Sequence, residues 1–408
     1  MIDLHENFEI NKNKIKSYLK FFGPAWLVMI ADMDASSTIG AAETGVLFKY
    51  GLIWFMLILI IPLYIVQEVS GRIGIATGSG LGDVIRKNYS RKTALIMSFP
   101  MALTDVITYV IEYVGIAIGL ELMGMPVLIS LPIIYIIHLF VVSKKEYNTT
   151  ERILIPISLI LIAAFVAVLF LRGPVNSSPF YFVPSTSYLF ILAVNVGAVI
   201  MPFMLFFQAS ATANKVDGVQ KSVTEKHNIK KQAMRSMKME TFLGATVSEL
   251  LMVIIEMAFS GVSTTTNFAS PVQLSSVLDV IAGSFSPYLF GIGLIAAGFI
   301  ALIVISLGSA WGIVESLGIK KTNTFKVYVL ESLPAVVLGM IVPATLLVNT
   351  VLNLLVIFVF VLIGPGVIMG LIAGNKKIMD IYTSKLKYRI VYWISLIFVV
   401  MFGILALY

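Results

Sequence analysis

Two short polar segments lie inside long apolar runs, and their side chains are the best suited to bind a cation. The segment from Asp32 to Thr38 carries two carboxylates and three hydroxyls, with apolar residues on both sides. Ser, Thr and Asp compete for backbone hydrogen bonds and favour caps and turns over helix interiors. We therefore predict a broken helix whose freed carbonyls lie beside Asp32 and Asp34. The alternative is a kinked helix that the two aspartates merely cap.

The second polar segment ends at Pro202, in the interior of the apolar run 187–212. Proline lacks a backbone N–H, so it frees the carbonyl four residues earlier, which belongs to Ala198. Alone, Pro202 is compatible with a simple kink. Together, the two segments interrupt the first and sixth apolar runs, which are matching positions in an inverted repeat of five plus five helices. Interrupted helices at matching places indicate the substrate site of a transporter.

Further acidic residues lie in two other apolar runs. Asp105, Tyr109 and Glu112 are spaced by four and three residues, so they share one face of a helix, and Glu249 and Glu256 are seven apart on another. Charges inside a membrane are costly and usually face a bundle interior or a water-filled cavity. Each set could form a proton or ion path, or could be buried acids with a structural role. Two more acids, Glu315 and Glu331, are expected near span ends.

The elements that must position these residues are membrane helices. The 408 residues are 58% hydrophobic and 12% charged, with mean hydropathy +0.95, whereas a soluble domain is about a quarter charged. Eleven apolar runs are long enough to cross a hydrocarbon core of roughly 30 Å. They cover residues 22–46, 51–71, 95–123, 126–142, 153–171, 187–212, 240–262, 286–312, 327–347, 350–373 and 388–408.

The basic residues predict the orientation of these spans. Of the 29 Lys and Arg residues, all but Lys49 and Arg172 fall on one side when the eleven spans alternate. Basic connections stay cytoplasmic, so we expect the N-terminus inside, the C-terminus outside and a multi-pass protein of the cell membrane. The polar stretch 1–20 before the first span does not resemble a cleavable signal peptide.

Several function classes lack their signatures. Cysteine is absent, and the histidines at 5, 138 and 227 have no metal-ligand spacing, so no enzyme site is apparent. No Gly-Lys-Ser/Thr phosphate loop is present, which argues against ATP. The net charge of +7 is explained by topology and lipid contact, not by nucleic acid. We expect no cofactor and no obligate protein partner. The lipid bilayer is the expected surrounding.

At the two polar segments the sequence resembles the NRAMP family of divalent-metal transporters. Asp34-Ala35-Ser36-Ser37 stands where the family has Asp-Pro-Gly-Asn, and Met201-Pro202-Phe203 stands where it has Met-Pro-His. Three further stretches are similar to family segments, namely Gln67–Gly78, Glu112–Gly119 and Phe290–Trp311.

This resemblance implies an all-α integral membrane protein with the LeuT-like fold. Its five-plus-five inverted repeat would have broken first and sixth helices and one extra C-terminal helix. Residues 1–408 would form a single transporter domain, with a first repeat at about 21–171, a second at about 187–373 and the extra helix at about 388–408.

The resemblance also implies a metal site. Its ligands would be the Asp34 carboxylate, the Ser37 side chain, the Ala198 carbonyl and the Met201 thioether. Asp32, where many members have Tyr, is a candidate fifth ligand. Sulfur favours Mn and Fe over Mg and Ca, although an oxygen-rich site also suits Mg. We expect a secondary transporter or facilitator of divalent metals by alternating access, with Mn or Fe favoured over Mg.

A rival interpretation is a LeuT-fold transporter of a small organic cation or amino acid, since fold alone does not fix the substrate. The Met201 thioether argues for a metal because it adds little to the binding of an ammonium group. A receptor or scaffold would leave the broken helices without a role.

The resemblance further implies weak or absent proton coupling. Glu112 is retained from the polar route of coupled members. The other positions of that route hold Tyr109, Phe203, Gln208, Val327 and Tyr328. Histidine titrates near neutrality, so its loss from two positions removes the groups best suited to pass protons. Asp105, or Glu249 with Glu256, could still form a different path.

Overall fold

The computed structural model describes residues 20–143, 147–183, 185–222, 229–264, 270–341 and 347–407. This part of the chain is helical, without strands. Its helices are α2 (Pro24–Ala31), α3 (Ala35–Phe48), α4 (Ile53–Thr77), α5 (Leu81–Asn88), α6 (Arg91–Leu122), α7 (Val127–Val142), α8 (Tyr147–Arg172), α9 (Thr186–Val199), α10 (Pro202–Ser222), α11 (Ile229–Phe259), α12 (Pro271–Ala282), α13 (Ser286–Leu317), α14 (Thr324–Ile341), α15 (Leu347–Gly374), α16 (Lys376–Met379) and α17 (Leu386–Leu405), with 3-10 turns η1 (Lys321–Asn323) and η3 (Asp380–Tyr382).

Helices occupy all eleven predicted spans. Within the described residues, nine helical segments are long and apolar enough to cross a membrane, and the joined α9 and α10 count as one of them. The other two spans are α7, a shorter apolar helix, and the first span, which is divided into α2 and α3. The protein is therefore a multi-pass membrane protein.

Both predicted helix breaks are present. The helix α2 ends at Ala31, and α3 begins at Ala35 after Asp34, whose backbone is extended with φ −77° and ψ −179°. In the sixth span, α9 ends at Val199 and α10 starts at Pro202. The polar segment and the proline end the helices where their backbone preferences oppose helical geometry.

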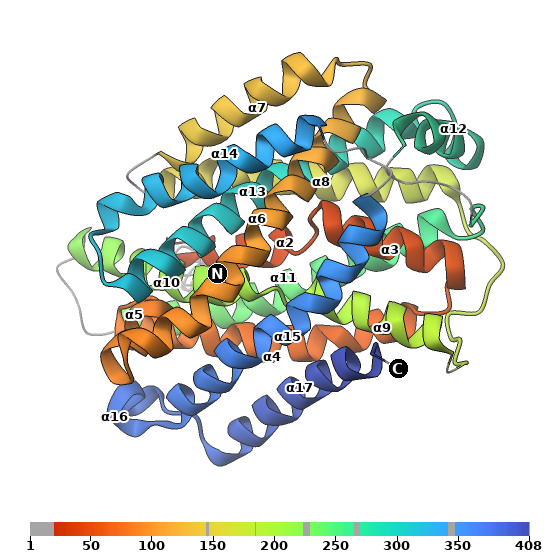
Figure 1. Ribbon diagram of the computed structural model, residues 1–408. Helices are drawn as coiled ribbons and strands as arrows, with labels where there is room; N and C mark the ends of the chain where they lie inside the picture. The colour runs from red at the N-terminus through yellow and green to blue at the C-terminus, as the bar shows by residue number, and fades with distance from the viewer. Residues whose placement is uncertain are drawn as a thin grey trace, which may run out of the picture.

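The broken helices lie in the middle of the bundle (Figure 1). The long helix α13 packs against α6, α8 and α10, and α11 packs against α2, α3 and α4. The helices α7, α14 and α17 lie at the periphery, where many of their apolar side chains are exposed to the lipid. The short helices α5 and α16 lie toward one end of the bundle, and α12 lies toward the other (Figure 1).

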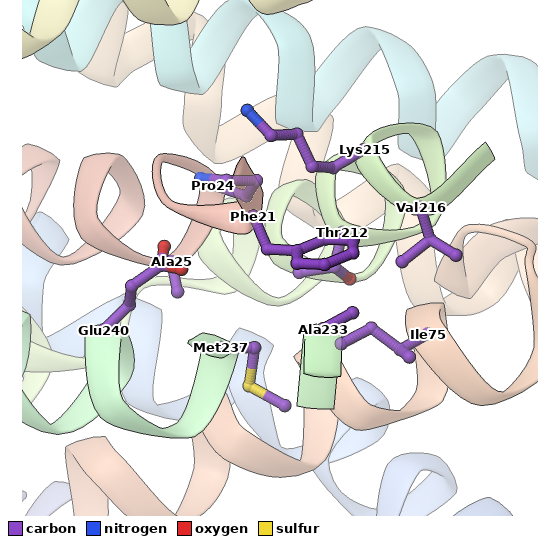
Figure 2. Close-up of a pocket in the computed structure, with 10 residues that line it drawn as sticks. All are labelled: Phe21, Pro24, Ala25, Ile75, Thr212, Lys215, Val216, Ala233, Met237 and Glu240. Carbon is purple, nitrogen blue, oxygen red and sulfur yellow. The ribbon is translucent and has the colours of Figure 1, made fainter. Parts of the chain in front are cut away.

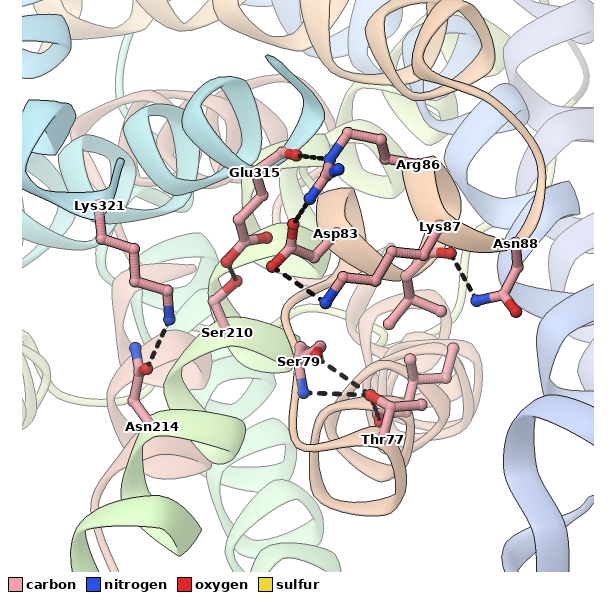
Figure 3. Close-up of polar contacts among 12 residues, drawn as sticks. Thr77, Ser79, Asp83, Arg86, Lys87, Asn88, Ser210, Asn214, Glu315 and Lys321 are labelled. Carbon is pink, nitrogen blue, oxygen red and sulfur yellow. Dashed lines mark hydrogen bonds and ion pairs between the residues drawn. The ribbon is translucent and has the colours of Figure 1, made fainter. Parts of the chain in front are cut away.

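A polar cluster holds α5 against the rest of that end (Figure 3). The Arg86 Nε donates to the backbone carbonyl of Glu315 at 2.8 Å, and the same guanidinium pairs with Asp83. The Glu315 Oε1 accepts from the Ser210 hydroxyl at 2.8 Å, so α5, α10 and α13 are joined. Glu315 lies near the end of its span, as predicted.

Glycines allow the broken helices to approach their neighbours closely. A Cβ placed on Gly197 in α9 would lie 1.7 Å from the carbonyl oxygen of Leu355 in α15. A Cβ on Gly45 in α3 would lie 2.2 Å from the carbonyl oxygen of Glu256 in α11. Small residues commonly permit such backbone contact between membrane helices.

We expect Gly197→Ala to lower the thermal unfolding midpoint and the yield of folded protein, because backbone atoms of Leu355 cannot give way as a flexible side chain can. Overpacking typically costs about 1–3 kcal/mol. The matched control is Gly339→Ala in α14, where the new Cβ would meet the Tyr113 Cβ at 3.2 Å. Equal midpoints for the two variants would contradict this account.

Candidate functional site

Asp34 is the N-cap of α3 and lies at the break in the first span. Its Oδ1 accepts hydrogen bonds from the backbone N–H of Ser37 and from the hydroxyl of Ser36, both at 2.7 Å. Its Oδ2 is buried and has no hydrogen-bond partner among the described residues. One oxygen thus stabilises the helix start, and the other has no N–H or O–H donor among the described residues.

Glu112 of α6 lies beside this carboxylate. Its Oε2 accepts from the backbone N–H of Ala35 at 3.0 Å, and its carboxyl group interacts with that of Asp34. The Oε1 has no partner within the described part of the chain. Two adjacent carboxyl groups in a dry interior are costly unless a cation or a proton offsets their charge.

The two helix breaks meet at Ser37. Its hydroxyl donates to the carbonyl of Ala198 at 3.4 Å, which links the first turn of α3 to the last turn of α9. Met201 follows in the non-helical step between α9 and α10 and is fully buried. The structure therefore brings Ser37 and Ala198 together. Met201 lies in the break of the sixth span, three residues after Ala198.

Asp32, by contrast, turns toward α11. Its Oδ2 accepts from the Ser248 hydroxyl at 2.7 Å, while its Oδ1 is unpartnered among the described residues. The carboxylate of Glu249, the next residue in α11, interacts electrostatically with Asp32.

Glu256 lies two turns further along α11 and has a different environment. Its Oε1 accepts from the backbone N–H of Leu52 at 2.9 Å, at the start of α4. Although Glu249 and Glu256 share a helix, the contacts of Glu256 tie it to the start of α4, and it has a capping role there.

A separate polar cluster joins α6 to α14. The Tyr109 hydroxyl donates to Glu331 Oε2 at 3.4 Å, and Asp105 lies close enough to Glu331 for their charges to interact. Both oxygens of Asp105 are buried without a hydrogen bond of normal geometry in the described residues. Glu331 thus lies inside α14, buried in this cluster, and the prediction that it lies near the end of its span is wrong.

His138 has a role that sequence reasoning missed. Its Nδ1 lies 2.8 Å from the hydroxyls of both Tyr113 and Tyr328, and its Nε2 lies 3.1 Å from the Ser306 hydroxyl. Metal-ligand spacing in the sequence does not reveal this role of His138. The available signal was a lone histidine inside an apolar span, because buried polar groups need partners.

Two small hollows flank the first broken helix. One lies at its Pro24 end, where Figure 2 shows Phe21, Lys215 and Glu240 among the lining residues. The other is lined by Thr38, one residue beyond Ser37, and by apolar residues of α6, α12 and α13. The candidate site between them is buried.

Two broken helices around a buried acidic junction are typical of the LeuT-like transporter fold. The solved structure of an Eremococcus coleocola manganese transporter matches with a TM-score of 0.78 at 16% identity, covering 95% of this chain and 86% of that one. The nucleobase-cation-symport transporter Mhp1 matches with a TM-score of 0.62 at 13% identity, covering 95% and 91%. At these identities the likeness concerns the fold alone.

Sequence comparison is more specific. The model of the natural resistance-associated macrophage protein-like (Nramp) family matches residues 25–408, so the chain belongs to this family. The divalent metal cation transporter MntH of Staphylococcus haemolyticus is 26% identical over 313 residues, which cover 72% of this chain and 70% of that protein. The metal transporter Nramp3 of Oryza sativa is 27% identical, covering 72% and 56%. The family indicated by the resemblance of the two polar segments is confirmed.

We expect Asp34→Asn to abolish divalent-metal binding as fully as Asp34→Ala does. Asn can still accept the Ser37 N–H bond and cap α3, so only the charge is lost, whereas Ala also loses a cap worth about 1 kcal/mol. Calorimetric titration with Mn²⁺ measures binding, and thermal unfolding separates binding from stability. Asp32→Asn should weaken binding less. Wild-type affinity in folded Asp34→Asn would exclude Asp34 as a ligand.

Proposed function

We propose that this protein carries divalent metal cations across the membrane, with Mn²⁺ or Fe²⁺ preferred over Mg²⁺. The observation that carries the proposal is the contact between the two breaks, where Ser37 of α3 meets the Ala198 carbonyl of α9. Carboxylate, hydroxyl and carbonyl oxygens converge there beside the break that holds Met201. Membership of the Nramp family supports the same function.

The proposed ligands are the free Oδ2 of Asp34, the Ser37 hydroxyl, the Ala198 carbonyl and the Met201 thioether. Sulfur interacts well with Mn²⁺, Fe²⁺ and softer metals but adds little for Mg²⁺ or Ca²⁺. Ser37 holds its place through the α3 cap, since its own N–H is bound to Asp34. Asp32 remains a candidate fifth ligand, although its Oδ2 bond to Ser248 directs it toward α11.

Alternating access is the proposed mechanism. The short half-helix α2 can move about the unwound residues 32–34, because no continuous helical hydrogen-bond ladder crosses them. The N-terminal end of α2 is held by Glu240, whose Oε2 accepts from the Gly23 N–H at 2.9 Å. Lys215 pairs with Glu151 nearby. Opening toward that side requires these polar contacts to separate.

The proposed orientation puts that end in the cytoplasm. The basic residues of α5 and α16 lie toward one end of the bundle, and α12, which has no Lys or Arg, lies toward the other (Figure 1). Basic connections favour the cytoplasmic side. The N-terminus would then be inside and the C-terminus outside. The two repeats would run from about 21 to 171 and from about 187 to 373.

Weak or absent proton coupling completes the proposal. Phe203 cannot titrate, and the Gln208 Nε2 donates to the Thr241 hydroxyl at 3.0 Å. Neither side chain can replace a histidine as a proton carrier. Among the groups of the usual route, Glu112 is the one that can still accept a proton.

Met201→Ala should reduce Cd²⁺ and Mn²⁺ uptake into proteoliposomes more than Mg²⁺ uptake, because only the softer metals gain from sulfur. An amino-acid mixture in parallel vesicles tests the organic-substrate alternative. Met204→Ala, in the first turn of α10 and equally buried, is the control for loss of packing. A uniform loss for all metals would mean that Met201 packs without coordinating.

We expect metal uptake driven by a metal gradient and membrane potential to cause little acidification of the vesicle interior. A pH-sensitive dye trapped in the proteoliposomes measures it. Robust metal-dependent acidification that disappears in Glu112→Gln would refute uncoupled transport and would show that Glu112 alone sustains coupling.

A further inference from the structure

Asp32, the candidate fifth ligand of the proposed transport site, interacts with the buried carboxylate of Glu249, which is outside that ligand set. Asp32 is the residue that ends α2, and Glu249 lies in the middle of α11. Asp32 is 1% exposed and Glu249 is 0% exposed. Their charges interact, so the two side chains form one cluster between α2 and α11.

Three of the four carboxylate oxygens in this cluster have no partner. Asp32 Oδ1 and both oxygens of Glu249 lack a hydrogen bond within the described residues. The fourth, Asp32 Oδ2, accepts from the Ser248 hydroxyl at 2.7 Å. A buried, unpartnered acceptor costs free energy, so a native protein normally supplies a partner for it.

Basic side chains do not supply that partner. The nearest lysine on α11 is Lys238, about three turns before Glu249, and its Nζ pairs with Glu68 at 3.3 Å. Asp32 and Glu249 form no ion pair with a basic side chain of the described residues. Two unpaired carboxylates in a low-dielectric interior require compensation by a ligand or by protons.

The geometry suits a cation held by oxygen. Asp32 caps the C-terminal end of α2, where the helix dipole is negative and favours a positive charge. Two carboxylates and the Ser248 hydroxyl provide only hard oxygen donors, and no sulfur ligand is part of the cluster. Hard donors of this kind select Na⁺, Mg²⁺ or Ca²⁺ over soft metals.

We propose that Asp32, Ser248 and Glu249 bind a second, hard cation between α2 and α11. This site is separate from the four proposed ligands around Asp34, and it takes Asp32 out of that ligand set. Because Asp32 also interacts electrostatically with Asp34, occupancy of either site alters the affinity of the other. The cation would tie the moving half-helix α2 to α11.

The test measures thermal unfolding of the purified full-length chain while Na⁺, K⁺, Mg²⁺ or Ca²⁺ replaces N-methylglucamine at constant ionic strength. The test uses the Asp34→Asn variant as its background, in which the proposed transport site is disabled. Its result therefore concerns the second site, and failure of the proposed function is measured separately. We expect one hard cation to raise the unfolding midpoint in a saturable way. Stabilisation by Na⁺ identifies a monovalent site, and stabilisation by Mg²⁺ identifies a divalent one.

Adding Glu249→Gln or Asp32→Asn to this background should reduce the apparent cation affinity by about tenfold or more. The cation-dependent rise in the unfolding midpoint is then lost at concentrations that saturate the background protein. The matched control is Glu256→Gln, on the same helix, whose capping bond to Leu52 the Gln carbonyl can keep. It should retain the full shift. The proposal is overturned if no cation stabilises the background protein between about pH 6 and pH 8, which would mean that protons satisfy the pair. A shift that persists in Glu249→Gln would overturn it equally.

Discussion

The structure depends on one constraint, namely that backbone groups freed inside the bilayer must find their partners within the protein. The break between α2 and α3 meets it through carboxylates. Asp34 Oδ1 accepts from the Ser37 N–H, and Glu112 Oε2 accepts from the Ala35 N–H. The second oxygen of each carboxylate has no N–H or O–H donor among the described residues, and the two carboxyl groups interact with each other. The same side chains therefore stabilise the broken helix with one oxygen, and in the proposed function the other oxygen of Asp34 binds the metal.

Two groups of acidic residues in the described part of the chain differ in whether they have a basic partner. At the end of the bundle that holds α5, acids pair with bases, as Asp83 does with Arg86 and Glu151 with Lys215. Around the first break, Asp34 and Glu249 are buried without a basic partner in the described residues. The first arrangement fixes helices in place. The second leaves buried carboxylates whose cost a cation would offset, as the proposed function requires.

The sequence predicts the breaks well because they arise from local chemistry. Residues 32–34 and Pro202 oppose helical geometry whatever surrounds them, and both lie where helices end. Side-chain direction is different, since it depends on which helix packs alongside. The bond from Ser248 to Asp32 joins residues 216 positions apart, and no local pattern indicates it. The burial of Glu331 and the contacts of His138 were missed for the same reason.

The interface of α6 with α14 holds a second set of buried polar groups. Tyr328 of α14 has its hydroxyl 2.8 Å from the His138 Nδ1. Asp105 lies close enough to Glu331 for their charges to interact, and neither forms an ion pair with a basic side chain of the described residues. The one histidine in the described part of the chain is held by hydroxyls on both ring nitrogens. The Tyr109–Glu331 hydrogen bond and the tyrosine hydroxyls at His138 therefore give α6 and α14 a shared polar contact inside the bundle.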